Sequence, residues 1–469
     1  MNAIFSYAKL VLLAFSITFV AFVSGCGGGG GGTAPPPPPS VSHNLWTWVS
    51  GSNVVNQKGI YGTLGTAAST NIPGARGGAV SWIDASGNRW LFGGLGDDSV
   101  PSYGYLNDMW KFDGTNWTWV SGSNVVDRIG VYGTQGTAAS TNIPGGRYLA
   151  VSWIDASGKL WLFGGRGYDS AGTFGQLNDL WKFDGADWTW VSGSNVVNQK
   201  GVYGTLGTAA ASNIPGARYQ AVSWIDGSGN RWLFGGIGYD SAGTNGYLND
   251  LWKFDGANWT WVSGSNVGGQ KGVYGTRGTA ASTNIPGARY EAVSWIDRSG
   301  NRWLFGGFGY DSAGTAGELN DLWKFDGANW TWVSGSNAGN QKGVYGMLGT
   351  AAAGNIPGGR SNAISWIDGS GNRWLFGGNG LDSAGTGGDL NDLWKFDGAN
   401  WTWVSGTNVV NQKGVYGTLG TAAAGNIPGG RSNAISWIDG SGNLWLFGGF
   451  GYDSAGTVGQ LNDLWRYQP

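Results

Sequence analysis

Residues 218–262 read RYQAVSWIDGSGNRWLFGGIGYDSAGTNGYLNDLWKFDGANWTWV, and this stretch decides the fold. Short runs of aromatic and β-branched residues are typical of strands, and the glycine-rich, Asp-rich segments between them are typical of turns. The predicted strands are Tyr219–Asp226, Arg231–Phe234, Leu248–Asp255 and Trp259–Val262. Each is joined to the next by a turn or loop, which predicts one sheet of four antiparallel strands.

The same pattern returns along the whole chain with a period of 71 residues. The tripeptide Trp-Thr-Trp begins, with no insertion or deletion between copies, at Trp46, Trp117, Trp188, Trp259, Trp330 and Trp401. Five tryptophans in each of six units account for all 30, and the chain also has 91 glycines and only 12% charged residues. A fixed period of this kind indicates one repeat architecture in place of several unrelated domains. We expect an all-β protein with almost no helix after its N-terminal leader.

Each unit resembles the kelch repeat, in which an apolar strand ends in Gly-Gly and is followed by a variable loop and an Asn-Asp-hydrophobic-Trp strand. The doubled glycines are Gly93-Gly94, Gly164-Gly165, Gly235-Gly236, Gly306-Gly307, Gly377-Gly378 and Gly448-Gly449. The units together cover residues 46–467. The chain departs from the family in having about twenty extra residues, such as 194–215, before each first strand. The resemblance implies a β-propeller of the superfamily that includes the galactose oxidase central domain.

The order of the strands indicates how such a propeller would close. Six sets of first, second and third strands begin at Arg76, Arg147, Arg218, Arg289, Arg360 and Arg431. The last set ends at Tyr467 with no fourth strand behind it, whereas the Trp46 strand precedes every set. We therefore expect a six-bladed propeller over residues 44–469 whose last blade is completed by the N-terminal strand, which would remove free sheet edges.

The N-terminus has the features of an export signal. Lys9 precedes an apolar run from Leu10 to Val23, which is short for a membrane span. The run ends in Val-Ser-Gly-Cys at Cys26, which resembles the lipobox of bacterial lipoproteins; the alternative is an ordinary secretory signal with a chance cysteine. We predict a signal peptide over 1–25 and, over 26–43, a lipidated Cys26 with a tether. Six glycines and then five prolines would make that tether flexible and then stiff. The expected location is the outer membrane or cell surface.

Composition excludes several classes of function. The formal net charge is −2 and the Lys and Arg residues recur singly, so there is no basic stripe for nucleic acid. One Cys and one His exclude a disulfide framework, a Cys/His zinc site and a catalytic triad with an in-chain His. The copper oxidases of the resembled family need imidazole and cysteine-modified tyrosine ligands, which His43 and Cys26 in the stalk would not supply. We expect no metal and no other cofactor.

Residues present in every unit are interpreted as structural. The Trp-Thr-Trp indoles are expected to pack between blades, with carbohydrate stacking as the alternative. The Leu-Asn-Asp side chains should cap turns, and the Arg that opens each first strand should pair with a nearby carboxylate. Calcium at loops such as Asp240–Thr244 stays open, although the ligand spacing of a known calcium loop is absent.

Positions that differ between units provide the candidate binding surface. They follow the first-strand Arg, follow Gly-Gly, or precede Leu-Asn-Asp, and all three places lie at one end of a four-stranded antiparallel sheet. Functional residues tend to lie on loops of a rigid scaffold, and we expect the long inserts on the same face. The alternative is neutral drift of exposed loops. The candidate binding residues are Tyr148, Arg166, Tyr219, Glu291, Glu318 and Asp389.

Three functions compete at this stage. The favoured one is a monomeric, surface-anchored binding module that recognises protein or glycan through the variable face. The second is an enzyme of the sugar epimerase or mutarotase-like kelch type. It would draw its acid and base from Glu291, Glu318, Asp389 and Arg166. The third is a structural surface protein without a small ligand.

Overall fold

The computed structural model describes residues 44–100 and 102–469. All regular elements in this part of the chain are β-strands, and they form antiparallel sheets consistent with a β-propeller. The all-β prediction is thus confirmed for the described residues. The predicted signal peptide, the tether and Cys26 lie outside them.

The repeat that contains residues 218–263 shows how the sequence becomes a sheet. Its strands are β15 (Arg218–Tyr219), β16 (Val222–Ile225), β17 (Arg231–Tyr239), β18 (Asn245–Phe254) and β19 (Trp259–Ser263). They pair in the order β15-β17-β18-β19, and β16 also pairs with β17. The first predicted strand is divided because Gln220 has φ +60°, which takes the backbone out of the extended region.

The second predicted strand is longer than expected. It runs through Gly235-Gly236 to Tyr239, with a shift of register between Phe234 and Gly236. Both glycines have positive φ, so in this repeat the doubled glycine makes a bulge inside a strand. In the second and fourth repeats the strand is interrupted at the doubled glycine, at 164–165 and 306–307, and resumes after it.

The other repeats contain the corresponding strands. The first has β2 (Arg76–Gly77), β3 (Val80–Ile83), β4 (Arg89–Asp97), β5 (Tyr103–Phe112) and β6 (Trp117–Ser121). The second has β7 (Ala138–Ala139), β8 (Arg147–Tyr148), β9 (Val151–Ile154), β10 (Leu160–Phe163), β11 (Arg166–Tyr168), β12 (Phe174–Gln176), β13 (Leu180–Phe183) and β14 (Trp188–Ser192). The fourth has β20 (Arg289–Tyr290), β21 (Val293–Ile296), β22 (Arg302–Phe305), β23 (Phe308–Tyr310), β24 (Ala316–Glu318), β25 (Leu322–Phe325) and β26 (Trp330–Ser334). The fifth has β27 (Arg360–Ser361), β28 (Ile364–Ile367), β29 (Arg373–Leu381), β30 (Gly387–Phe396) and β31 (Trp401–Ser405). The sixth has β32 (Arg431–Ser432), β33 (Ile435–Ile438), β34 (Leu444–Tyr452) and β35 (Val458–Gln468).

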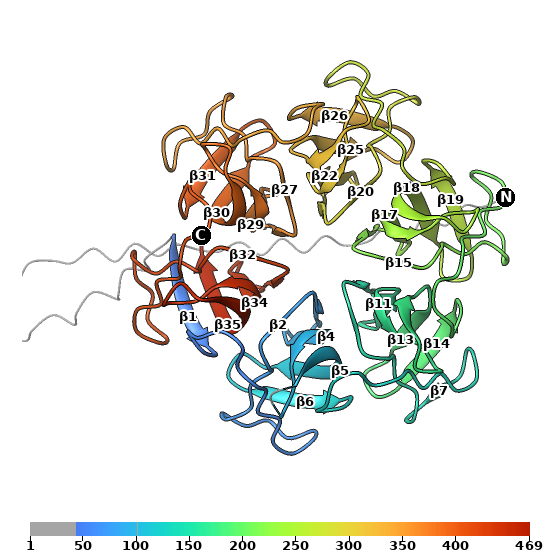
Figure 1. Cartoon of the computed structure of the whole chain (residues 1–469), viewed down its shortest axis with the longest axis horizontal. Coiled ribbons are helices and arrows are strands. Elements are labelled where there is room, and N and C mark those ends of the chain that lie inside the picture. Colours follow the sequence, from blue (N-terminus) through green and yellow to red (C-terminus); the bar gives the residue numbers. More distant parts are fainter. Residues whose placement is uncertain (1–43, 101) are drawn as a thin grey trace, which may run out of the picture. The chain divides into compact units, whose positions relative to one another are not determined.

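The first and last strands of the described chain lie side by side. Strand β1 (Leu45–Ser50) pairs antiparallel with β35, and Trp46 lies opposite Tyr467. Figure 1 shows β1, in blue, beside the red strands of the sixth repeat, and the sheets follow one another around a central axis. The inner strands of successive repeats contact one another, and β3 of the first repeat contacts β33 of the sixth.

Tryptophans fill the layers between neighbouring sheets. Trp117 is 2% exposed and packs on Phe447 of the preceding sheet, with ring centroids 5.5 Å apart. Trp119, two residues on, is only partly buried and meets Tyr61 of the long insert edge to face. The interpretation of the repeated tryptophans as packing residues is confirmed for these contacts, since aromatic side chains supply much of the apolar area buried in a core.

A buried ion pair recurs in every repeat. Arg218 donates to both carboxylate oxygens of Asp250, at 2.7 Å each, and both side chains are almost completely buried. Arg218 thus has the carboxylate partner predicted for it. The prediction that the Asp caps a turn is wrong; the neighbouring Asn249 does so, because its Oδ1 accepts a hydrogen bond from the amide of Ser265.

The long insert covers the outer edge of each sheet. The Ala210 amide donates to the Trp259 carbonyl, the Gly207 amide donates to the Trp261 carbonyl, and in the second repeat the insert forms β7 against β14. Edge strands left open invite association with other chains, so this cover protects the sheet. The insert reaches the predicted binding face at its beginning, where the Asp127 amide donates to the Tyr105 carbonyl at 2.8 Å, and its last residue, Pro144, accepts from Asn107.

Candidate functional site

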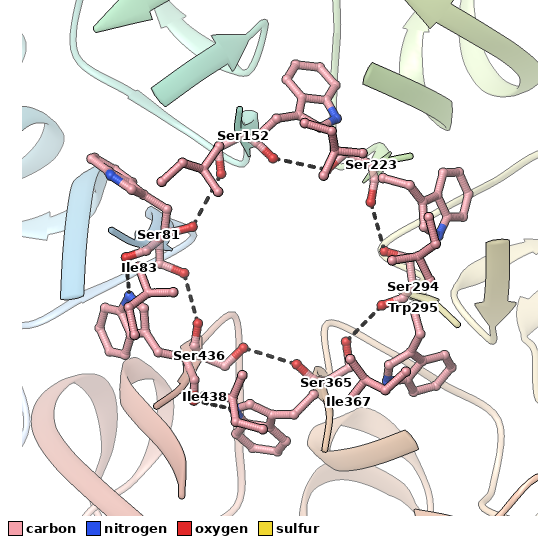
Figure 2. A pocket seen from close by; sticks show the side chains of 18 residues that line it. Ser81, Ile83, Ser152, Ser223, Ser294, Trp295, Ser365, Ile367, Ser436 and Ile438 are labelled. Atoms are coloured by element: carbon pink, nitrogen blue, oxygen red, sulfur yellow. Dashed lines mark hydrogen bonds between the residues drawn. The ribbon is translucent and has the colours of Figure 1, made fainter. Parts of the chain in front are cut away.

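Three rings of side chains line a channel along the axis of the sheets. The channel is lined by β16 and its counterparts, the inner strands. In each repeat the residue before the inner strand and every second residue after it face the channel, as the two-residue period of a strand requires. In the third repeat these are Ala221, Ser223 and Ile225, and their counterparts in the other repeats line the same cavities. Each serine hydroxyl donates to the serine carbonyl of the neighbouring repeat at 3.2–3.4 Å, and Figure 2 shows these bonds passing around the channel.

A second circle of hydrogen bonds surrounds one end of the channel, which we call the mouth. The amide of one residue in each repeat donates to the carbonyl of its counterpart in the preceding repeat, at 2.7–3.1 Å. These residues, the mouth ring, are Gly78, Leu149, Gln220, Glu291, Asn362 and Asn433. All six have φ between 55° and 65°, a conformation that costs side-chain-bearing residues energy unless the surroundings impose it. They bound a cavity of about 150 Å³.

The variable residues outside the mouth ring meet in pairs across neighbouring repeats. Tyr105 lies 5.4 Å from Tyr148, measured between ring centroids, and Tyr247 lies 4.9 Å from Tyr290. At the corresponding place the Ser361 hydroxyl donates to Oε1 of Glu318. Where one repeat has a tyrosine at this contact, its partner in the next repeat is also a tyrosine, and where it has a glutamate the partner is a serine. Sequence inspection missed these pairs because their members lie 43 residues apart in different repeats.

Three of the predicted binding residues lie together. The guanidinium of Arg166 is 5.8 Å from the ring centre of Tyr219, and Tyr148 and Tyr219 are 6.2 Å apart. Arg166 also faces Tyr148 in the pairing of β11 with β8. Burial raises the pKa of both tyrosines although the Arg166 charge opposes the change, so both hydroxyls stay protonated at neutral pH.

Glu291 and Glu318 form a carboxyl pair beside these rings. Asn362 donates to Glu291, and the adjacent Ser361 donates to Glu318 at 3.1 Å. Each carboxyl group therefore has a hydrogen-bond donor in the next repeat. Burial and then the charge of Glu318 raise the pKa of Glu291 to about 8. Burial raises the pKa of Glu318 to about 7, against the opposing effects of Ser361 and Arg360.

Asp389, the sixth predicted residue, lies at the same end of its sheet in the fifth repeat. It pairs with Asn379 across β29 and β30, and Asn379 donates to its carboxylate at 3.3 Å. The side chain is 8% exposed, and burial raises its pKa. Asp389 contacts Asn379 of the fifth repeat and Ser432 of the sixth. The other five predicted residues belong to the second, third and fourth repeats.

Several buried oxygen atoms at the mouth have no hydrogen-bond partner. Among the described residues they include Gln176 Oε1, Gln220 Oε1, Glu318 Oε2, Asn433 Oδ1 and Gln460 Oε1. Asn433 and Gln460 both lie against Gly77, where a Cβ atom would be 3.1 Å from Gln460 Oε1 and 3.3 Å from Asn433 Cβ. Gln220, Asn433 and Gln460 were not predicted as site residues. The signal that could have found them is Gly77-Gly78, the one repeat with no side chain at either variable position after the Arg.

The mouth thus has two different sides. The first, which we call the tyrosine arc, consists of Tyr148, Tyr219 and Tyr290 at the end of the first strands of the second to fourth repeats. At the same position the fifth, sixth and first repeats have only small residues, and we call this side the polar notch: Ser361, Ser432 and Gly77. Unpaired acceptors occur in the repeats of both sides, Gln220 and Glu318 in those of the arc and Asn433 and Gln460 in the sixth. Aromatic surface combined with such acceptors is typical of a small-ligand site.

The repeated acidic loops are occupied by backbone hydrogen bonds. In the loop Asp240–Thr244, Asp240 Oδ1 accepts from the amides of Ala242 and Thr244, each at 2.9 Å, so this candidate calcium ligand already has two backbone donors. At the opposite end of the sheet, Asp226 accepts from the Trp232 indole at 2.7 Å and from Arg302 of the next repeat at 3.0 Å. Within residues 44–100 and 102–469, no group of three or more His, Cys, Asp or Glu side chains is placed to hold a metal ion.

No helix in residues 44–100 and 102–469 is long and apolar enough to cross a membrane.

Comparison with known proteins finds likeness only among solved structures. No protein-family model and no curated protein matches the chain. One similar structure is that of YjhT, at 15% identity and a TM-score of 0.48, covering 84% of this chain and 95% of that one. Another is a fungal alcohol oxidase of the AA5 family in complex with copper, at 14% identity and 0.44, covering 87% and 77%. A third is a protein of unknown function from Dyadobacter fermentans DSM 18053, at 8% identity and 0.46, covering 92% and 100%.

Proposed function

We propose that this chain is a closed six-bladed kelch-type propeller, held at a membrane through lipidated Cys26, that binds a glycan at the mouth of its channel. The proposal has three parts, which concern closure, ligand and anchor, and each has its own support and test.

Closure is supported by contacts between the two ends of the described chain. The Asn44 amide donates to the Gln468 carbonyl, and β1 supplies the outer strand next to β35. The hydrogen bonds of the mouth ring also pass from the sixth repeat to the first, since the Gly78 amide donates to the Asn433 carbonyl at 2.9 Å. In a closed ring every sheet packs between two neighbours, so no sheet has an uncovered face.

The observation that carries the glycan assignment is the division of the mouth into tyrosine arc and polar notch. A pyranose ring has apolar C–H faces and an edge of hydroxyl donors. Tyrosine rings pack against the first, and unpaired oxygen atoms such as Asn433 Oδ1 and Gln460 Oε1 accept from the second. The acceptors are already buried, so a ligand hydroxyl would satisfy them without further desolvation of the protein.

A glycan array probed with the full chain tests the assignment, followed by affinity measurements on any glycan retained. Tyr219→Ala should weaken binding at least about tenfold, because aromatic residues at the centre of a site supply much of the binding energy. The matched control is Ser228→Ala with Ser299→Ala, exposed positions in the hairpins at the other end of the channel. Retained binding in Tyr219→Ala, or its loss in the control, would place the ligand elsewhere.

The anchor is tested at its thiol. Cys26→Ser should abolish incorporation of a fatty-acid probe and release the protein from membranes. The propeller should still fold, because the anchor precedes residue 44. Label on the serine variant would refute lipidation at this position.

A second candidate, acid–base turnover of the bound sugar, is favoured by one observation. A carboxyl with a pKa near 8 is partly protonated at neutral pH and can give or take a proton. Exchange spectroscopy on the two anomers of a retained reducing sugar would detect it. Catalysis lost in Glu291→Gln would support an enzyme, and exchange at the uncatalysed rate in the wild type would reject it.

A further inference from the structure

The unpaired groups at the mouth are acceptors, and this restricts the chemistry of the ligand. Gln460 is 6% exposed, and its Nε2 donates to the Tyr103 hydroxyl at 3.1 Å. Its Oε1 then faces Gly77 without a donor. Gln220 Oε1, Asn433 Oδ1 and Glu318 Oε2 are in the same state. A ligand that satisfies these atoms must bring N–H or O–H groups to them.

The carboxyl pair adds a requirement for positive charge. Glu291 accepts from Asn362 and Glu318 accepts from Ser361, both neutral donors, although a carboxylate can accept several hydrogen bonds. Arg360 is the nearest cation that acts on Glu318, but its Nη1 and Nη2 donate to Asp392 in the buried ion pair. Within residues 44–100 and 102–469, the pair is therefore without a counter-ion of its own.

The other charged and titratable groups around the pair do not supply one. Tyr148, Tyr219 and Tyr290 interact electrostatically with Glu291 and are neutral. Arg166 stacks on the rings of Tyr219 and Phe174, at 5.8 and 5.0 Å. A cation placed at Glu291 would also lie beside the tyrosine arc, and aromatic faces attract cations.

We infer that the glycan bound at the mouth carries a protonated amino group, which is seated at Glu291 and Glu318 while hydroxyls of the same ligand donate to Asn433 and Gln460. The inference rests on the proposed glycan function. It also states that sugars with a carboxylate bind more weakly, because a ligand ammonium can form ion pairs with Glu291 and Glu318 as these ionise, whereas a ligand carboxylate can form none.

Four β1,4-linked tetrasaccharides distinguish these statements in titrations of the full chain at pH 6.5, built from glucosamine, N-acetylglucosamine, glucose and galacturonate. The glucosamine tetramer should bind at least about tenfold more tightly than the N-acetylglucosamine, glucose and galacturonate tetramers. In the Glu291→Gln, Glu318→Gln double variant the preference for the amine should fall to about onefold. Glu318→Asp, which keeps the charge, should retain it and guards against a folding defect.

The possible results distinguish failure of the amine site from failure of glycan binding. Equal affinity for the amino and neutral tetramers, or tighter binding of galacturonate, would refute the amine site and leave a glycan-binding module. A preference for the amine unchanged in the double variant would also refute it. If no tetramer binds and the array is empty, the glycan function itself fails. A lysine peptide that binds while all four tetramers do not would show that the ammonium belongs to a protein ligand, which overturns both.

Discussion

Asp250 shows how one residue organises a repeat. Its carboxylate accepts from Arg218 Nη1 and Nη2, from the Tyr203 hydroxyl at 2.6 Å and from the Trp252 indole at 2.7 Å. These four donors come from the insert, the first strand and the third strand. A charge with this many donors can be buried, whereas the same charge without them could not.

Loss of one partner should therefore be costly. Asp250→Ala leaves the buried Arg218 guanidinium without its counter-charge, and the free energy of unfolding should fall by about 3–5 kcal/mol. Urea unfolding followed by tryptophan fluorescence measures it. Lys253→Ala on the neighbouring strand position is the control and should change stability by less than about 1 kcal/mol, as is usual away from buried networks. Equal effects of the two variants would mean that the hydrogen bonds of Asp250 with Arg218, Tyr203 and Trp252 do not hold the repeat together.

The carboxyl of Glu291 should make the stability of the protein depend on pH. Its pKa in the folded protein is raised to about 8 from an ordinary value near 4.5, chiefly by burial. The folded state then binds more protons than the unfolded state between these pH values. Stability is therefore present below about pH 4.5 and is lost as pH rises through 8.

Thermal unfolding across pH 5 to 8.5 tests this. The melting temperature of the wild type should decline relative to that of Glu291→Gln, which has no carboxyl to titrate, and the two curves should diverge toward pH 8.5. Parallel curves would show that Glu291 ionises freely in the folded protein.

At the scale of elements, the strand-forming stretches could be predicted and their interruptions could not. The Trp-Thr-Trp strand and the Leu-Asn-Asp-Leu-Trp strand follow from alternating aromatic residues, and both occur as β19 and β18. Gln220 at φ +60° could not be predicted, because its conformation is imposed by a hydrogen bond from its amide to Leu149 of the preceding repeat. Contacts between repeats depend on the geometry of the assembled sheets, which local sequence does not contain.

The same limit applies to the candidate site. Internal comparison of the repeats indicated Tyr148, Arg166 and Tyr219, and the structure brings these three together. Gln460 and Asn433 also lie at variable positions, but sequence could not show that their oxygen atoms are unpaired, because this depends on their contacts with Gly77 of another repeat. Nor could it show that Asp250, present in every repeat, pairs with an Arg 32 residues earlier.

Strand β1 offers a test with a built-in control, because Trp46 and Trp117 occupy the same place in the repeat. Trp46 is 1% exposed and packs on Phe376 at 5.4 Å, and Trp117 packs on Phe447 at 5.5 Å. If β1 completes the last sheet, Trp46→Ala and Trp117→Ala should each lower the free energy of unfolding by about 3–5 kcal/mol. A Trp46 variant as stable as the wild type would mean that the N-terminal strand is dispensable.

Closure of the whole ring is best tested by moving the chain ends. Asp397, Gly398, Ala399 and Asn400 connect the third strand β30 to the fourth strand β31 in the fifth repeat. In the sixth repeat the corresponding strands are β35 and β1, which belong to opposite ends of the described chain. Joining Tyr467 to Trp46 through Asp-Gly-Ala-Asn would therefore reproduce the connection between Phe396 and Trp401. New ends can be opened at Ser228 in an exposed hairpin tip, where chain breaks are tolerated.

This circular permutant should fold, and its melting temperature should lie within a few degrees of that of the parent residues 44–469, because every strand pairing is kept and one loose chain end is replaced by a tight turn. Adding Trp46→Ala to the permutant should cost as much as it does in the parent, which shows that the joined strand occupies its original place. In a row of sheets that does not close, the short link would have to pull distant ends together. The permutant would then aggregate or unfold well below the parent, and that outcome would reject the closed propeller.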